Sequence, residues 1–156
     1  MPLRSKIFAI LSGLWATFIF SNSLKNGVNS EKMSNPIANA ISNFFNNIGI
    51  NWNEESVAFF IRKAAHFTEF MLLGILVSLI FVFINRKFSY SFGTILFIIT
   101  IIPVCDEFIQ TFVVGRSGQV SDVVLDFCGA FVGFISVVAL KKITNKKSDY
   151  SKRMHG

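Results

Sequence analysis

Five acidic side chains lie within or at the edge of long apolar stretches of this 156-residue chain: Glu69, Asp106, Glu107, Asp122 and Asp126. An ionised side chain in hydrocarbon costs about 2.5–3.5 kcal/mol unless it is paired or faces a wet cavity. The chain has only nine Asp and Glu residues, so more than half of its acids occupy costly positions. We interpret these five acids as candidate catalytic residues.

Basic side chains accompany the acids. Arg62, His66 and Glu69 are spaced i, i+4 and i+7, which places them on one face of a helix. His66 and Glu69 could act as an acid/base pair, because imidazole titrates near neutral pH. The planar guanidinium groups of Arg62 and Arg116 are suited to binding a phosphate or a carboxylate. This set indicates a site for an anionic ligand.

The other acids share helix faces of their own. Asp106 and Gln110 are four residues apart and lie on one face, whereas Glu107 points about 100° away. Asp122 and Asp126 form a second four-residue pair. Together with the histidine, these carboxylates could hold a divalent metal of unspecified identity. Alternatively, the same side chains could form a buried ion-pair network that joins three helices.

The composition indicates a membrane protein. Hydrophobic residues make up 52% of the chain and charged residues 15%, whereas soluble proteins average about 25% charged residues. The net charge of +6 does not indicate nucleic-acid binding, because the basic residues lie between apolar runs and in the last sixteen positions. Cys105 and Cys128 lack the spacing of a metal or redox motif and are expected to be packing residues.

The apolar runs predict an all-α integral membrane bundle of four transmembrane helices plus one short interfacial amphipathic helix. The spans are expected at residues 3–20, 61–84, 91–113 and 122–140. A capping box of Asn51 and Glu54 is expected to open the helix that contains the second span, and Pro103 to kink or break the third. The first span could instead be a cleaved signal peptide, but retention is favoured because more spans follow.

Residues 33–50 predict the amphipathic helix. Apolar residues recur there at helical spacing, and Pro36 suits the first turn. The helix could lie in the membrane interface or pack over the spans.

Four spans place both termini on the same side. Basic residues before the first span, at residues 86–87 and after residue 140 would share that side, which the positive-inside rule makes cytoplasmic. We expect a transmembrane domain over residues 1–142 and a basic, disordered cytoplasmic tail over residues 143–156. The polar candidates then lie together at the outer end, and Gly129 and Gly133 would permit close helix approach there.

The same residues resemble the VanZ-like family of small bacterial membrane proteins. The resemblance rests on four stretches in the family's order: Phe20-Ser21-Asn22-Ser23; Arg62-Lys63-Ala64-Ala65-His66-Phe67-Thr68-Glu69-Phe70 with Leu73-Gly74; Asp106-Glu107-x-x-Gln110-x-Phe112-x-x-Gly115-Arg116; and Asp122-x-x-x-Asp126-x-x-Gly129 with Gly133. Phe70 stands where a tyrosine is common. The resemblance implies a multi-span protein of the bacterial cytoplasmic membrane. The protein after which the family is named lowers susceptibility to teicoplanin.

We therefore expect a protein of the cell envelope whose polar pocket binds or modifies an anionic or lipid-linked component. Arg62, Gln110 and Arg116 are the expected ligand-binding residues. No catalytic motif decides whether the protein is an enzyme. The alternatives are a small proton-coupled transporter or flippase, and a non-catalytic accessory subunit.

Overall fold

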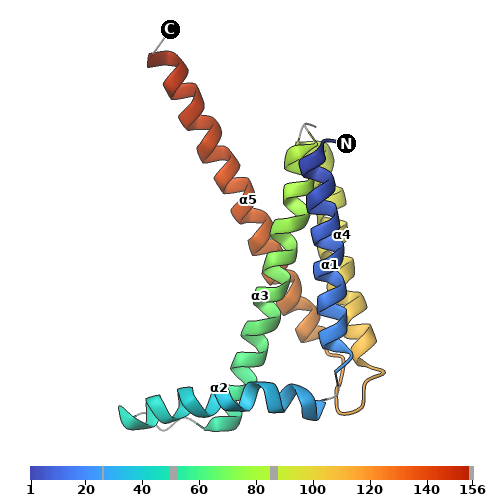
Figure 1. Ribbon diagram of the computed structural model, residues 1–156, viewed down its shortest axis with the longest axis vertical. Coiled ribbons are helices and arrows are strands. Elements are labelled where there is room, and N and C mark those ends of the chain that lie inside the picture. The colour runs from blue at the N-terminus through green and yellow to red at the C-terminus, as the bar shows by residue number, and fades with distance from the viewer. Residues whose placement is uncertain (26, 50–52, 85–87, 155–156) are drawn as a thin grey trace.

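The computed structural model describes residues 1–25, 27–49, 53–84 and 88–154, and these ranges contain helices and no strand. The helices are α1 (Leu3–Ser23), α2 (Gly27–Asn47), α3 (Glu54–Phe83), α4 (Phe88–Gln110) and α5 (Val120–Met154), shown in Figure 1. Four of them, all except α2, are long and apolar enough to cross a membrane. The predicted all-α fold with four spans is confirmed.

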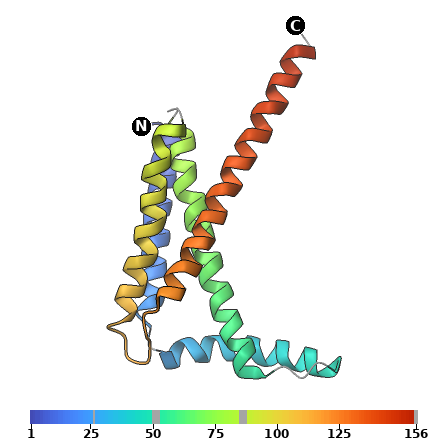
Figure 2. The same ribbon diagram turned by 180° about the vertical axis from the view of Figure 1, so that it is seen from behind.

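Two of the spanning helices, α1 and α4, run side by side, whereas α3 and α5 cross each other (Figures 1 and 2). Helix α3 lies beside α1 and α4 near the N-terminus and diverges from them toward α2, while α5 begins beside α4, crosses α3 and then leaves the bundle. Helix α2 lies crosswise at the end opposite to the two termini, and it packs Ala38 against Val57 and Ala58 of α3. Packing onto a span, one of the two placements considered for this helix, is therefore present, and its placement in the membrane interface stays a prediction.

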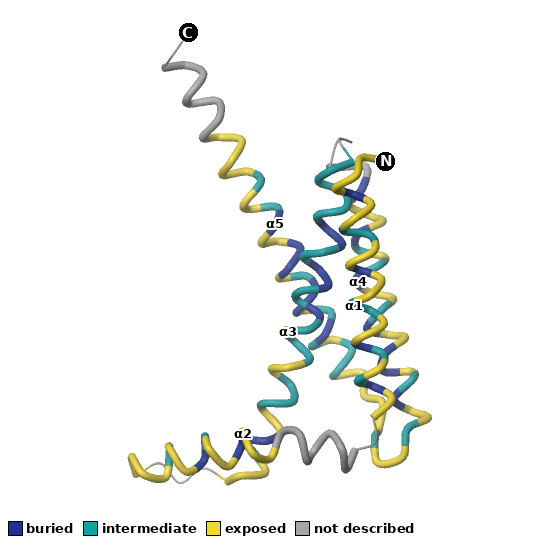
Figure 3. Tube along the Cα trace, in the orientation of Figure 1, coloured by how far each residue is buried: buried dark blue, intermediate teal, exposed yellow. Residues whose placement is uncertain are grey.

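The buried core consists of side chains at the contacts between the helices. Ile19, Phe70, Leu73, Ile95 and Ile99 are fully buried and come from α1, α3 and α4. Figure 3 shows buried residues where the helices touch and exposed ones on their outer faces. The outer faces carry many large apolar side chains, which suits a surface in contact with lipid.

Glycines set the close contact between α3 and α5. A Cβ atom added to Gly74 would lie 2.0 Å from the carbonyl oxygen of Ala130, and one added to Gly133 would lie 2.1 Å from that of Met71. Neither position can therefore carry a side chain without separating the helices. The close approach predicted from Gly129 and Gly133 is confirmed, and Gly74 supplies a matching small residue on α3.

Two helix starts differ from the sequence-based expectation. Helix α2 begins at Gly27 rather than near residue 33, so Pro36 lies inside it; one missing backbone donor does not end the helix here. Helix α3 is capped by Asn53, whose side chain accepts a hydrogen bond of 3.2 Å from the backbone nitrogen of Glu55. Asn51, the predicted cap, lies outside the described residues, as does the predicted turn at residues 85–87.

Two helix ends also differ. Helix α4 continues through Pro103 and ends at Gln110 rather than near residue 113. After Gln110, backbone hydrogen bonds such as that from Val113 N to Gln110 O join residues three apart, instead of residues four apart as in an α-helix. Helix α5 continues to Met154, whereas we expected the span to end near residue 140 and an irregular tail to follow. No glycine or proline lies between Gly133 and the last residue, so nothing in the sequence interrupts that helix.

Candidate functional site

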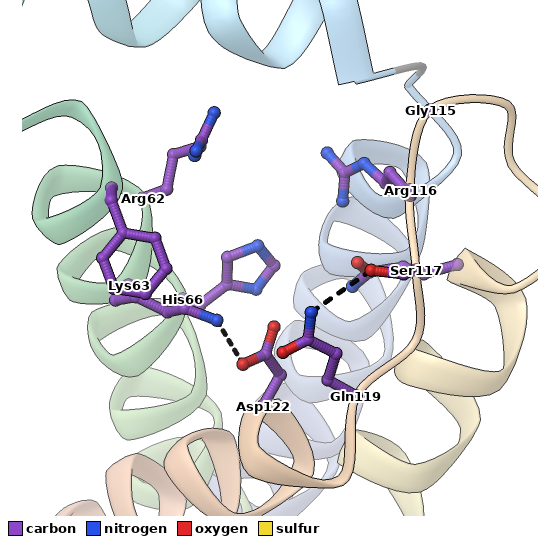
Figure 4. Close-up of a pocket in the computed structure, with 10 residues that line it drawn as sticks. Arg62, Lys63, His66, Gly115, Arg116, Ser117, Gln119 and Asp122 are labelled. Carbon is purple, nitrogen blue, oxygen red and sulfur yellow. Dashed lines mark hydrogen bonds and ion pairs between the residues drawn. The ribbon is translucent and has the colours of Figure 1, made fainter. Parts of the chain in front are cut away.

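A cavity of about 230 Å³ opens at the end of the bundle where α2 lies. It is bordered by α3, the end of α4, the loop of residues 111–119 and the start of α5 (Figure 4). Its lining residues are Phe59, Arg62, Lys63, His66, Gln110, Gly115, Arg116, Ser117, Gln119 and Asp122. The structure therefore brings five of the predicted site residues together in one cavity, although they come from three parts of the chain.

A cluster of two acids and a histidine lies next to this cavity. Asp106 and Asp126 are fully buried. One donor atom from each of them and one from His66 lie within 4.8 Å of one another, and Nδ1 of His66 is 4.0 Å from Oδ2 of Asp126. Asp106 comes from α4, Asp126 from α5 and His66 from α3, so three helices contribute one donor each.

Gln110 joins two of the acids. Its Nε2 donates hydrogen bonds to Oδ2 of Asp106 at 2.9 Å and to Oε1 of Glu107 at 3.1 Å. The same nitrogen lies 3.5 Å from Oγ of Ser23. Asp106 and Glu107 point in different directions from α4, as their spacing predicted, and the amide of Gln110 reaches both. The side chain therefore holds two carboxylates in fixed orientations.

Glu107 supports the loop rather than lining the cavity. Its Oε2 accepts a hydrogen bond of 3.0 Å from the backbone nitrogen of Gln119. The loop packs closely at this point, since a Cβ atom added to Gly118 would lie 2.6 Å from the carbonyl oxygen of Glu107. These contacts hold the loop that carries Arg116 against the end of α4. The catalytic role considered for Glu107 stays a prediction.

Glu69 faces α1. Its Oε1 accepts a hydrogen bond of 3.1 Å from Nδ2 of Asn22, and its backbone oxygen accepts one of 2.9 Å from Nε1 of Trp15. The described residues include no hydrogen bond between Glu69 and His66, and the acids that lie near the imidazole are Asp126 and Asp106. The expected acid/base pairing of His66 with Glu69 stays a prediction, whereas the structure places acids of α4 and α5 near the imidazole.

Arg116 reaches the cavity from the loop. Gly115 adopts a positive φ of 78°, a conformation that glycine accepts at little cost, and it turns the chain just before the arginine. Nη2 of Arg116 donates to the backbone oxygen of Asn22 at 3.4 Å. Burial lowers the pKa of the Arg116 guanidinium, while the carboxyl groups of Asp106 and Glu107 raise it. An arginine side chain stays charged in proteins, so this residue brings a cation to the site.

Sequence reasoning missed several contributors. Lys63 forms an ion pair with Asp122 across the cavity (Figure 4), and its ammonium group lies 5.1 Å from the centre of the Phe59 ring. Lys63 directly follows Arg62, but the i, i+4, i+7 spacing that identified its neighbours does not include it. Asn22 lies in the serine-containing stretch after the first span, and Trp15 carried no signal in the sequence.

Comparisons with known proteins agree with this architecture. No curated protein and no solved structure matches the chain. A family model described as VanZ/LLP1 matches residues 8–141, which include all four spans for most of their length and every residue of the site described above. The chain is a multi-pass membrane protein and belongs to the VanZ/LLP1 family.

Proposed function

We propose that this protein binds the anionic head group of a lipid-linked envelope component in the cavity between α3 and the 111–119 loop. The observation that carries this proposal is the convergence of basic side chains on one cavity. Arg62 and Lys63 come from α3 and Arg116 comes from the loop, with His66 between the two arginines (Figure 4). Guanidinium groups bind phosphate and carboxylate oxygens through paired, charge-assisted hydrogen bonds.

The surroundings of the cavity suit a ligand with a lipid tail. The cavity lies at the end of the spanning helices, beside the crosswise helix α2. Large aromatic side chains are exposed at this level, with 48% of Phe59, 64% of Phe108 and 74% of Phe112 accessible. A head group could occupy the cavity while its apolar tail stays in the bilayer against these rings.

The charge distribution favours an outward-facing cavity. Arg4 and Lys6 lie at the start of α1, and Lys141, Lys142 and further lysines follow the membrane part of α5, at the end opposite to the cavity. The positive-inside rule makes that basic end cytoplasmic. In the bacterial cytoplasmic membrane the cavity would then face the outer leaflet, where lipid-linked wall precursors, teichoic acids and phospholipids are available. Binding a wall precursor would account for an effect on teicoplanin susceptibility.

A proton-coupled transporter is less well supported. Residues 70–105 and 127–140 contain no Asp, Glu or His, so these lengths of α3, α4 and α5 offer no titratable carboxylate or imidazole for a proton relay across the membrane. An accessory subunit without a ligand would bind neither anionic probe in the following experiment.

The binding test uses the full chain in phosphatidylcholine nanodiscs, titrated with dioctanoyl phosphatidic acid and with a polyprenyl diphosphate. Loss of one charge-assisted interaction of about 1.5–3 kcal/mol should weaken binding to Arg116→Ala by about 10–150-fold. Arg4→Ala is the matched control, because it removes an arginine from the opposite end of the bundle and should bind like the wild type.

Two results would contradict the proposal. Equal losses in Arg116→Ala and Arg4→Ala would indicate non-specific attraction to a basic protein, and a well-folded wild type that binds neither probe would exclude an anionic ligand of this class. Orientation is tested separately by labelling Ser117→Cys in a cysteine-free background. Reaction only from the cytoplasmic side would overturn the outward placement.

A further inference from the structure

We propose that His66, Asp106 and Asp126 form a binding site for one divalent transition-metal cation at the inner end of the cavity. The three side chains come from α3, α4 and α5, and each offers one donor atom within 4.8 Å of the other two. The proposal concerns these buried donors and does not rest on the anionic ligand proposed for the cavity mouth.

The unpartnered atoms of these side chains point to a missing cation. Both carboxylate oxygens of Asp126, Oδ1 of Asp106 and Nδ1 of His66 are buried and have no hydrogen-bond partner among the described residues. Buried polar atoms are almost always satisfied, and an uncompensated buried carboxylate costs several kcal/mol. Two fully buried acids side by side therefore require a positive charge or protons.

Two basic side chains of the cavity, those of Lys63 and Arg116, have other partners. Lys63 is paired with Asp122, and Arg116 donates to the backbone oxygen of Asn22. Gln110 satisfies one oxygen of Asp106 with a neutral amide and leaves the other oxygen available. A bound cation would contact the remaining oxygens and the imidazole nitrogen together.

The spacing of the donors is close to that of a metal site. Donors bound at about 2.0–2.2 Å to one ion lie about 3.0–3.5 Å from each other, and Nδ1 of His66 is 4.0 Å from Oδ2 of Asp126. Side-chain rotations that bring the donors about 0.5–1.8 Å closer would complete the set. Gln110 already orients Asp106 through a hydrogen bond, which is the kind of outer-shell support that metal ligands usually have.

The donor types select the class of metal. One imidazole nitrogen with two carboxylate oxygens suits Mn²⁺ or Zn²⁺, whereas Mg²⁺ and Ca²⁺ prefer sites made of oxygen alone. The adjoining cavity is open, so further coordination positions could be taken by water or by an oxygen of a bound molecule. A cation here would also attract an anionic group from the mouth of the cavity.

The test measures metal binding directly. The full chain, purified in detergent and stripped with a chelator, is titrated with Mn²⁺ alone, with loss of the free-ion paramagnetic resonance signal as the readout, and with Zn²⁺ by calorimetry. We expect one ion per wild-type chain. Asp126→Asn and His66→Gln should weaken metal binding at least about tenfold, because even the loss of a residue that only hydrogen-bonds to a metal ligand has an effect of that size. Glu55→Gln, at the exposed start of α3, is the matched acid-to-amide control.

Each other outcome overturns the site. If monodisperse, helical wild-type protein binds neither ion, the acids are compensated by protons or water. If Glu55→Gln weakens binding as much as Asp126→Asn, the ions bind the surface. X-ray absorption of the Zn²⁺-loaded wild type must show an imidazole ligand, and a shell without one excludes His66 even where the variants fold poorly. Arg116→Ala should keep its metal while losing anion binding, so this proposal and the proposed function can fail separately.

Discussion

Replacing Gly133 by alanine tests the close packing of the α3 and α5 backbones. The added Cβ atom would lie 2.1 Å from the carbonyl oxygen of Met71, whereas such contacts are essentially never shorter than 3.0 Å. The obstacle is backbone and not the end of a flexible side chain. The two helices must therefore separate by about 0.9 Å at this point.

The cost follows from two opposing effects. Overpacking of a close contact costs about 1–3 kcal/mol, and a rigid backbone neighbour places this case near 3. Alanine recovers about 1 kcal/mol through its higher helix propensity. The net loss of about 2 kcal/mol corresponds to a Tm lower by about 4–8 °C for a chain of this length.

Thermal unfolding of the detergent-purified protein, followed by circular dichroism, measures the change. Gly93→Ala is the control, because a Cβ atom added to Gly93 has nothing within 4 Å. Its Tm should be unchanged or up to about 4 °C higher, since only the helix propensity changes. If Gly133→Ala and Gly93→Ala shift the Tm equally and in the same direction, the backbones of α3 and α5 do not touch as described and the reasoning is refuted.

Two further substitutions test the parts that position the site. Glu107→Gln should loosen the 111–119 loop, because the single oxygen of the amide cannot accept from both Gln119 N and Gln110 Nε2 in their present positions. A loss of about 1.4 kcal/mol in the stability of the loop would make trypsin cleave after Arg116 about tenfold faster. An unchanged cleavage rate would contradict this role of Glu107. Trp15→Phe removes the indole donor to the backbone oxygen of Glu69 and should lower the Tm by a few degrees, corresponding to about 0.5–1.5 kcal/mol, whereas an unchanged Tm would show that this bond does not join α1 to α3.

The fold was predictable because the bilayer restricts the choices. Apolar runs of span length can only be helices when their backbone must be satisfied without water, so four runs gave four spans. The helix boundaries were less predictable. Pro36 reads as a first-turn residue, yet α2 begins at Gly27 and continues through it. The end of α5 had no marker, because the basic residues after residue 140 change the polarity of the helix without interrupting it.

The site was predictable in its members but not in its pairings. Spacing placed His66 and Glu69 on the same side of one helix, and from this we expected them to act together. In the structure Glu69 is held by Asn22 of α1, while His66 lies near Asp126 of α5. These pairings depend on which helices are neighbours, and one sequence does not contain that information. The lysine that pairs with Asp122 was missed for the same reason.

The glycine contact and the buried acids depend on each other. Gly129 lies three residues after Asp126, and a Cβ atom there would be 2.3 Å from the carbonyl oxygen of Phe67, the residue next to His66. The close approach of the helices therefore brings Asp126 to the imidazole. It also buries the carboxylate fully, which raises the cost of leaving it uncompensated. A looser contact would let water reach the acids and remove their need for a cation, so the small residues are as much a part of this site as its charged ones.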